Sequence, residues 1–359
     1  MWLAMEYSKR INNLRKSLSE TDIDTIFISS KDNIRYYSGF TGTFAFLLIN
    51  DNKSIIITDS RYTVRAQEES PDYEIYQLKS GDNWLVNSTK QIGSKLIGFE
   101  GNDMSVNMLN QLKQRSEDKL DWKDFSNEIT KERVIKSQSE VKIIEETISI
   151  SDNAFNSVSK KISEGMTEKE IAWEIEKKMR DLGAESLSFD TIVASGLNGS
   201  KPHHSPTDKK VKLNEAITID MGAKYKGYCS DLTRTIFIGN PDDKFKKIYN
   251  VVLRSQLIAM ETAREEMTGE EIDKISREII SKENFGEYFG HSLGHGVGLE
   301  IHENPGVGPN SKNKIMAGMI YTIEPGIYID GWGGIRIEDM VLMTDNGNKL
   351  LSHAEKESY

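Results

Sequence analysis

Short apolar runs alternate with polar turns over the first third of the chain. The segment Lys9–Leu18 has a helical composition, and turns rich in Asp, Asn, Gly and Ser separate the apolar runs that follow it. Runs of this length and composition predict strands. They are Thr25–Ile28, Phe44–Ile49, Ser54–Thr58, Tyr73–Leu78 and Leu96–Phe99. The pattern predicts a compact α/β unit.

Helix signals are stronger in the rest of the chain. A hydroxyl residue followed three positions later by Glu is the pattern of a capping box, and such a pair opens three periodic segments. The polar segment 127–136 precedes the first of them and predicts a domain boundary, with one domain over residues 1–130 and a second over residues 131–359. The pairs are Ser137 with Glu140, Thr167 with Glu170, and Thr268 with Glu271.

Four apolar runs in the second domain also predict strands. Residues 221–228, between the first two runs, contain Gly222 and Gly227, which suit an antiparallel hairpin with a long or bulged turn. Helices followed by antiparallel strands predict an α+β architecture for this domain. The runs are Ala216–Asp220, Asp231–Ile238, Ile320–Glu324 and Ile335–Met343.

Composition and charge exclude several classes of protein. The 359 residues are 37% hydrophobic and 28% charged, which is ordinary for a globular protein of about two domains. The formal net charge of −10 disfavours nucleic acid and anionic membrane surfaces as partners. The longest apolar run, Phe44–Ile49, is far shorter than the roughly 18 residues that a membrane span needs.

Cys229 is the only cysteine, so an intramolecular disulfide and a metal site built from several thiolates are excluded. Charged residues at positions 6, 9 and 10 interrupt the N-terminal segment before it reaches the length of a secretory signal. We therefore expect a cytoplasmic location.

Four carboxylates of the second domain lie in or beside strand-like apolar runs. Asp220 and Glu324 end such runs, Asp231 opens one, and Glu338 lies inside another. A single acidic residue at a strand end usually caps a turn in solvent, but four in one domain are harder to explain in this way. Buried carboxylates are costly unless they are paired or bind a metal. If the four converge, two divalent cations would neutralise their combined charge.

Five of the six histidines lie between residues 203 and 302. For any one of them a structural hydrogen bond is as good an explanation as a functional role. With His295 as the nitrogen ligand, the four carboxylates make an oxygen-rich set that suits Mn²⁺, Co²⁺ or Fe²⁺, and Zn²⁺ is also compatible with it. A helical zinc motif is not expected at His291 and His295, because Gly294 and Gly296 flank the second histidine.

Five short segments of the second domain resemble the pita-bread metallopeptidases, the family of aminopeptidase P, prolidase and methionine aminopeptidase. Their order and spacing match over roughly residues 137–350. The first domain resembles the creatinase-like N-terminal domain of the proline-specific branch, which methionine aminopeptidases lack. The implied fold is an α/β N-terminal domain followed by an α+β pita-bread catalytic domain. The five segments are 218–223, 230–235, 291–299, 322–328 and 334–339.

The resemblance implies a site for two divalent metal ions, with Mn²⁺ as the first choice. Asp231 and Glu338 would bridge both metals, Asp220 would chelate one, and His295 with Glu324 would complete the other. A hydroxide held between the metals would be the nucleophile. Glu324 would also carry a proton from the water to the leaving nitrogen.

The resemblance also assigns the residues around the metals. His203 and His302 would be catalytic residues that contact the substrate, His302 around the scissile amide, and His291 would line the proline pocket. Tyr328 and Arg336 match residues near the metal centre. For Arg336 a structural salt bridge to a buried carboxylate is an equally good interpretation.

The implied reaction is hydrolysis of the bond between the first residue and proline in peptides, by a homodimer. The main alternative is a prolidase restricted to Xaa-Pro dipeptides, and the segment Ser195–Lys201 departs from the common family pattern, so the preference stays open. Creatinase-like amidinohydrolases and non-catalytic binding proteins share the fold but lack the metal ligands. Nucleotide binding at Gly294–Gly298 is disfavoured, because a glycine motif without a flanking strand and helix is weak evidence.

Overall fold

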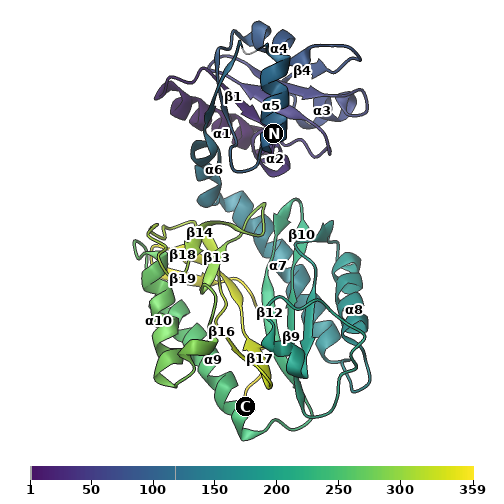
Figure 1. The fold of residues 1–359 in the computed structure, drawn as a ribbon, viewed down its shortest axis with the longest axis vertical. Coiled ribbons are helices and arrows are strands. Elements are labelled where there is room, and N and C mark those ends of the chain that lie inside the picture. Colours follow the sequence, from purple (N-terminus) through teal and green to yellow (C-terminus); the bar gives the residue numbers. More distant parts are fainter. Residues whose placement is uncertain (1, 118) are drawn as a thin grey trace. The chain divides into compact units, whose positions relative to one another are not determined.

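A computed structural model describes residues 2–117 and 119–359 (Figure 1). The chain divides into two compact units, Met1–Arg133 and Val134–Tyr359, and each is described by itself. Within the described residues no helix has both the length and the apolar character that crossing a bilayer requires.

The first unit is built on a six-stranded mixed sheet with the strand order β4-β3-β2-β1-β5-β6. The central strand β1 pairs antiparallel with β2 and parallel with β5. The elements are α1 (Trp2–Ser19), β1 (Thr25–Ile28), α2 (Lys31–Ser38), β2 (Phe46–Ile49), β3 (Ser54–Thr58), α3 (Thr63–Glu69), β4 (Glu74–Gln77), α4 (Trp84–Ile92), β5 (Leu96–Phe99), α5 (Val106–Arg115), β6 (Asp121–Asp124) and α6 (Ser126–Val134).

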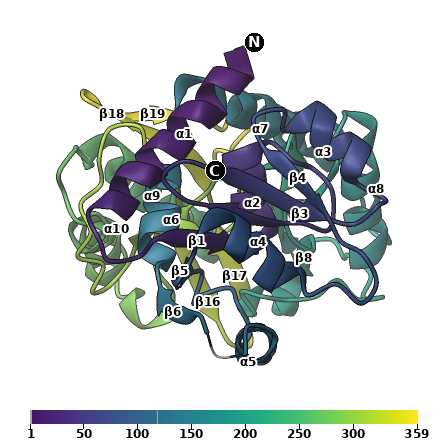
Figure 2. The same ribbon diagram turned by 90° about the horizontal axis from the view of Figure 1, so that it is seen from above.

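Helices cover both faces of this sheet. Helices α4 and α5 bury Leu85 and Leu112 in one cluster with Phe27 and Ile57 of the sheet. Helix α1 lies on the opposite side of the strands (Figure 2). The prediction of an α/β unit is confirmed, and each predicted strand lies within two residues of its predicted bounds.

The second unit contains two groups of helices on the outside and strands between them (Figure 1). Its strands form sheets of two, three and five strands. The elements are α7 (Gln138–Ser159), α8 (Glu168–Asp181), β7 (Ser186–Leu187), β8 (Ile192–Ser195), the 3₁₀ helix η1 (Gly196–Ser200), β9 (Glu215–Met221), β10 (Ala223–Tyr225), β11 (Tyr228–Cys229), β12 (Leu232–Ile238), α9 (Asp243–Thr262), α10 (Gly269–Lys282), η2 (Gly286–Tyr288), β13 (Gly294–Gly296), β14 (Glu303–Val307), β15 (Ile320–Ile323), β16 (Gly326–Ile329), β17 (Gly333–Arg336), β18 (Asp339–Thr344) and β19 (Gly347–Leu350).

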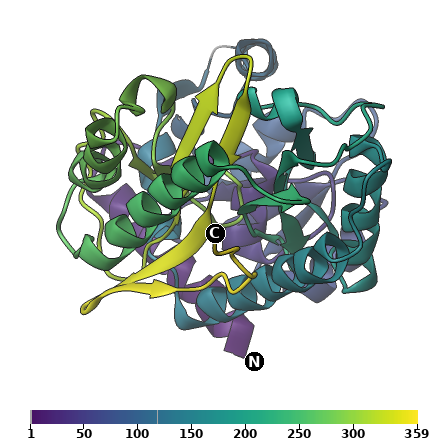
Figure 3. The same ribbon diagram turned by 90° about the horizontal axis from the view of Figure 1, so that it is seen from below.

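Each group of helices has its own apolar core. Helices α7 and α8 pack on strands β8, β9 and β12, where Phe155 and Ile175 contact the cluster around Ile219. Helices α9 and α10 share a second core with β15, β17 and β18, in which Tyr249 and Ile272 are buried. Figure 3 shows α9, in green, crossing the yellow C-terminal strands. The observed architecture confirms the predicted α+β class.

All three predicted capping boxes are present at the starts of α7, α8 and α10. In each, the hydroxyl accepts a hydrogen bond from the backbone N–H three residues later, and the Glu side chain accepts one from the backbone N–H of the cap. These bonds satisfy donors that a helix start otherwise leaves unpaired. The predicted antiparallel pairing of residues 216–220 with 231–238 is also confirmed, in β9 and β12.

The single strand expected over Ile335–Met343 is wrong, because the chain changes sheets there. Strand β17 ends at Arg336 in a two-stranded sheet, and β18 begins at Asp339 in a five-stranded sheet. Between them, the backbone N–H of Glu338 donates to the Thr233 carbonyl oxygen at 3.0 Å. An apolar run alone does not reveal such a change of partner, and the change leaves Glu338 at the junction of two sheets.

Candidate metal centre and substrate cavity

A cavity of about 630 Å³ lies in the second unit. Every site residue expected from the sequence lines it, although these residues come from distant parts of the chain. Other parts of the wall are apolar, with Phe189, Ile192 and Ile301 among them. The expected residues are His203, Asp220, Asp231, His291, His295, His302, Glu324, Tyr328, Arg336 and Glu338.

Strand pairing brings the four acidic residues together. Asp220 on β9 lies opposite Thr233 of β12, and Asp231 directly precedes β12. In the other half, Ile323 at the end of β15 pairs with the first residue of β18. Glu324 and Glu338 are the next residues outward on these two strands, so antiparallel register places them at the same end.

His295 enters the site from the short strand β13, which pairs with β15. Its Nε2 atom lies 3.3 Å from Glu324 Oε1 and 3.5 Å from Asp231 Oδ2. The neighbouring glycines allow this close approach: a Cβ on Gly294 would lie 1.9 Å from a backbone oxygen, and one on Gly296 would lie 2.2 Å from another. Glycine is required there for packing of backbone against backbone.

One potential ligand atom each from Asp231, His295 and Glu338 lies within 4.8 Å of the others. Burial, and then the neighbouring Glu338, raises the pKa of Asp231 well above its ordinary value. Burial, followed by the charges of Glu324 and Asp220, raises the pKa of Glu338 in the same way. These carboxylates lack enough positive charge around them when no cation is bound.

The pKa values of Glu324 and His295 are both shifted toward the charged form, unlike those of Asp231 and Glu338. Burial opposes ionisation of Glu324, but the hydrogen bond and positive charge of His295 outweigh it and lower the pKa of Glu324. Burial likewise opposes protonation of His295, but the same bond raises the pKa of His295. The two side chains therefore stabilise each other as an ion pair.

The donor set fits divalent metal ions. Asp220 Oδ1 and Glu338 Oε1 are buried and have no hydrogen-bond partner within the described part of the chain. Buried polar atoms in proteins are nearly always satisfied, so two bare carboxylate oxygens beside an imidazole need another partner. Several carboxylate oxygens with one imidazole nitrogen suit Mn²⁺, Co²⁺, Fe²⁺ or Zn²⁺.

Arg336 lines the cavity and also forms an ion pair with a buried carboxylate. A position near the metal centre and a structural salt bridge are therefore compatible for this residue. Its Nη2 atom lies 2.7 Å from Asp220 Oδ2. Its Nη1 donates to the Tyr328 hydroxyl at 2.8 Å, and its Nε donates to Thr233 Oγ1 at 3.1 Å. Burial raises the pKa of Tyr328 to about 12, so this hydroxyl keeps its proton.

Four histidines besides His295 line the cavity, and the sequence analysis selected three of them, His203, His291 and His302. His291 Nε2 lies 2.9 Å from the Tyr328 hydroxyl oxygen, and burial lowers the pKa of His291, which favours the neutral ring. The ring of His302 packs edge-on against that of His295 at a centroid distance of 4.3 Å. His203 lies on the loop that follows η1.

Two threonines that the sequence analysis did not select contact the acidic group. Thr233 Oγ1 donates to Glu338 Oε2 at 2.7 Å, and Thr322 Oγ1 donates to Glu324 Oε1 at 3.2 Å. Thr233 follows Asp231 by two positions and Thr322 precedes Glu324 by two. Since alternate strand residues share a face, this period of two was a signal that could have identified them.

Family models match nearly the whole chain. The model described as metallopeptidase family M24 matches residues 142–345, and the model of the creatinase/prolidase N-terminal domain matches residues 10–135.

Individual relatives match the chain over its length. The solved structure of an Xaa-Pro dipeptidase from Bacillus anthracis is 40% identical and covers 98% of this chain and 99% of its own, with a TM-score of 0.94. The solved X-Pro aminopeptidase from Thermotoga maritima MSB8 is 37% identical, with 97% and 99% coverage and a TM-score of 0.90. The Xaa-Pro dipeptidase of Pyrococcus furiosus is 39% identical over 97% of this chain and 99% of that protein. The chain belongs to metallopeptidase family M24, and its N-terminal unit is a creatinase/prolidase N-terminal domain.

Proposed function

We propose that this protein is a metal-dependent exopeptidase that hydrolyses the bond between the first residue and proline in peptides. The observation that carries the proposal is the group formed by Asp231, His295 and Glu338, whose ligand atoms lie within 4.8 Å of one another in a cavity of peptide size. The proline preference is supported by the names of the relatives, which are Xaa-Pro peptidases.

We assign Asp231 and Glu338 as ligands shared by two cations, Asp220 as a ligand of one, and His295 with Glu324 as ligands of the other. Their charges support this assignment, because two divalent ions would balance four carboxylates. Mn²⁺ is the first choice of metal. When bound, the cations would supply Lewis acidity that polarises the amide carbonyl and activates water.

Glu324 is assigned the proton transfer. The nitrogen that leaves from an Xaa-Pro bond carries no hydrogen in the peptide, so the enzyme must deliver a proton to it. Glu324 is held in place for this role by hydrogen bonds with Thr322 and His295. It would accept a proton from water and donate it to the proline nitrogen.

The remaining side chains are assigned to the substrate. His203 and His302 would contact the scissile amide, since both line the cavity around the acidic group. His291, Tyr328 and Arg336 would form the proline side of the pocket, where the bonds from Arg336 to Tyr328 and between Tyr328 and His291 keep three polar groups in fixed positions.

Two substrate lengths compete, and we favour the aminopeptidase that accepts longer peptides. A dipeptidase is the second candidate, and the two relatives named Xaa-Pro dipeptidase support it. The test is an assay of the enzyme reconstituted with Mn²⁺ on matched Xaa-Pro and Xaa-Pro-Yaa peptides. Cleavage of both supports the aminopeptidase, and cleavage of Xaa-Pro alone supports the dipeptidase. Cleavage of neither, with metal bound, overturns the proposed function.

We also propose a domain boundary, an oligomeric state and a location. We place the catalytic domain at residues 131–359, because every cavity residue lies there. We propose a homodimer because of the family resemblance. We propose a cytoplasmic location because a chain with a single cysteine cannot form an intramolecular disulfide, as is usual for proteins of that compartment. Light scattering of the purified enzyme tests the dimer, and metal analysis tests for about two ions per chain.

A further inference from the structure

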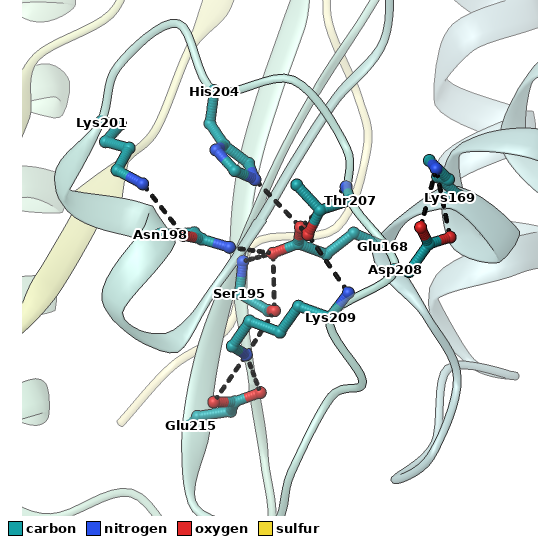
Figure 4. Close-up of polar contacts among 10 residues, drawn as sticks. All are labelled: Glu168, Lys169, Ser195, Asn198, Lys201, His204, Thr207, Asp208, Lys209 and Glu215. Atoms are coloured by element: carbon teal, nitrogen blue, oxygen red, sulfur yellow. Dashed lines mark hydrogen bonds and ion pairs between the residues drawn. The ribbon is translucent and has the colours of Figure 1, made fainter.

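Glu168, the first residue of α8, lies outside the cavity but is the centre of a buried network of hydrogen bonds (Figure 4). Its side chain is 0% exposed. Six hydrogen bonds from four residues meet at its carboxylate. A carboxylate in such a place is costly unless its lone pairs are satisfied, and here they are.

The two carboxylate oxygens hold the two flanks of His203 separately. Oε1 accepts bonds only from residues that precede His203. These come from the backbone N–H of Ser195 at 2.9 Å, its hydroxyl at 2.8 Å and the side-chain amide of Asn198 at 3.0 Å. One oxygen thus holds the chain as it enters the loop.

The other oxygen, Oε2, accepts bonds only from residues that follow His203. His204 Nε2 lies 2.9 Å away, and the backbone N–H and hydroxyl of Thr207 donate at 3.0 and 2.6 Å. A single side chain on a rigid helix therefore fixes both ends of the segment that carries His203.

The carboxylate of Glu168 is ionised in the folded protein. Burial opposes ionisation, but hydrogen bonds from Asn198, Thr207 and His204 outweigh it and lower the pKa of Glu168 to about 2. The position at the start of α8 adds the favourable end of the helix dipole. Hydrogen bonds to a charged acceptor are roughly twice as strong as neutral ones, so the ionised carboxylate holds the loop more strongly than a neutral group would.

The anchored segment forms part of the wall of the cavity. Pro202, His203 and His204 all line it. The 3₁₀ helix η1, which comes just before His203, also packs tightly on β17: a Cβ on Gly199 would lie 2.8 Å from the backbone nitrogen of Gly334. The loop is thus held by the carboxylate and by the strand that ends at Arg336.

A simple role as a helix cap does not account for Glu168. Thr167 and Glu170 already form the complete capping box of α8. The bonds of Glu168 instead go to residues 27 to 39 positions further along the chain.

We propose that Glu168 is a positioning residue of the active site, which sets the place of His203 at the cavity by holding both flanks of its loop. This inference deepens the proposed function and rests on it for the catalytic consequence. The segment Ser195–Lys201, whose sequence departs from the common family pattern, takes part directly through Ser195 and Asn198.

The test is Glu168→Gln. An amide has one acceptor oxygen, so the variant can accept hydrogen bonds from only one flank of the loop. Because a misplacement of about 1 Å can cost about 100-fold, we expect kcat on an Xaa-Pro peptide to fall about 10- to 100-fold with KM changed less. Hydrogen exchange should become faster in residues 195–209 while β9 and β12 keep their protection. Glu170→Gln is the matched control, since it alters a carboxylate of the same helical turn that bonds to Thr167.

A double-variant cycle separates positioning from general structural damage. If Glu168 acts through His203, Glu168→Gln combined with His203→Ala should be no slower than His203→Ala alone. Additive losses, or unchanged exchange at 195–209, would overturn the inference. Asn198→Ala removes one hydrogen bond from the same network. If Glu168→Gln does not fold, Asn198→Ala replaces it in the same measurements. A wild-type enzyme without turnover counts against the proposed function alone, and the exchange result then still decides whether Glu168 holds the loop.

Discussion

The imidazole of His295 faces the carboxylate of Glu324, with 3.3 Å between Nε2 and Oε1. This contact joins two residues from different strands, β13 and the end of β15. Both are proposed ligands, and only Glu324 also has a proposed part in proton transfer. The contact therefore links metal binding to the chemical step in the proposed mechanism.

Glu324→Gln is expected to abolish turnover while the fold is kept. The amide is close to the carboxylate in size but cannot accept and release the proton, and loss of a general acid–base group typically costs about 100- to 10,000-fold. Steady-state kinetics and circular dichroism measure the two properties. Glu278→Gln, on the exposed face of α10, is the control. An undiminished kcat would remove Glu324 from the mechanism.

His291→Ala is expected to impair hydrolysis of proline peptides much more than metal content. The His291 ring makes hydrogen bonds with Tyr328 and with the backbone of Ser292, and neither partner is a proposed metal ligand. Kinetics on an Xaa-Pro peptide and metal analysis of the same preparation give the comparison. Equal losses of activity and metal would make His291 a structural residue.

Thr233→Val is expected to weaken metal affinity about 10- to 100-fold, as loss of a bond to a ligand commonly does. Valine keeps the shape of threonine but cannot donate to Glu338 or accept from Arg336. Thr147→Val is the control, because the Thr147 hydroxyl is bonded to its own helix. Titration of metal-free enzyme with Mn²⁺ measures the affinity. Equal affinities for the two variants would mean that the bond from Thr233 to Glu338 does not support metal binding.

Removal of metal is expected to lower the melting temperature, and more strongly at pH 8 than at pH 6. Burial and the nearby Glu338 raise the folded-state pKa of Asp231, so the metal-free folded protein binds protons more tightly than the unfolded chain. Its stability then falls as pH rises through that raised pKa. Scanning calorimetry of chelator-treated enzyme at the two pH values measures this.

Asp231→Asn removes one of the repelling carboxylates. The same calorimetry of this variant tests whether that repulsion destabilises the metal-free protein. The variant should lose metal, yet its metal-free form should melt at a higher temperature than the metal-free wild type and depend less on pH. A lower melting temperature than that of the metal-free wild type would mean that Asp231 stabilises the fold by contacts other than metal binding.

Local sequence patterns predicted where helices and strands lie better than they predicted which strands pair with one another. Ser137 and Glu140 identify a helix start from four residues, because both hydrogen bonds of a capping box are local. The break between Arg336 and Asp339 is different, since it depends on Thr233 accepting a bond from Glu338 far along the chain.

The candidate site shows the same division. Asp220 and Glu324 could be selected because four carboxylates in or beside apolar runs of one domain are hard to explain as turn caps in solvent. Glu168 could not, because a Glu in the first turn of a helix is common and its role depends on a loop folding back to it. Thr233 is an intermediate case. Its spacing of two residues from Asp231 is visible in the sequence, but its contact with Glu338 is not.

The charge of Glu168 predicts a stability difference that depends on pH. Its pKa is 4.5 in ordinary surroundings and about 2 in the fold, so ionisation favours the folded state above pH 4.5, and this contribution disappears as pH falls toward 2. Metal-free Glu168→Gln should melt about 5 °C below metal-free wild type at pH 7, as expected for losing a hydrogen-bonded buried charge, and the gap should close in acid. Thermal unfolding between pH 2 and 7 measures it. A gap that stays constant with pH would show that the carboxylate contributes through shape and not through charge.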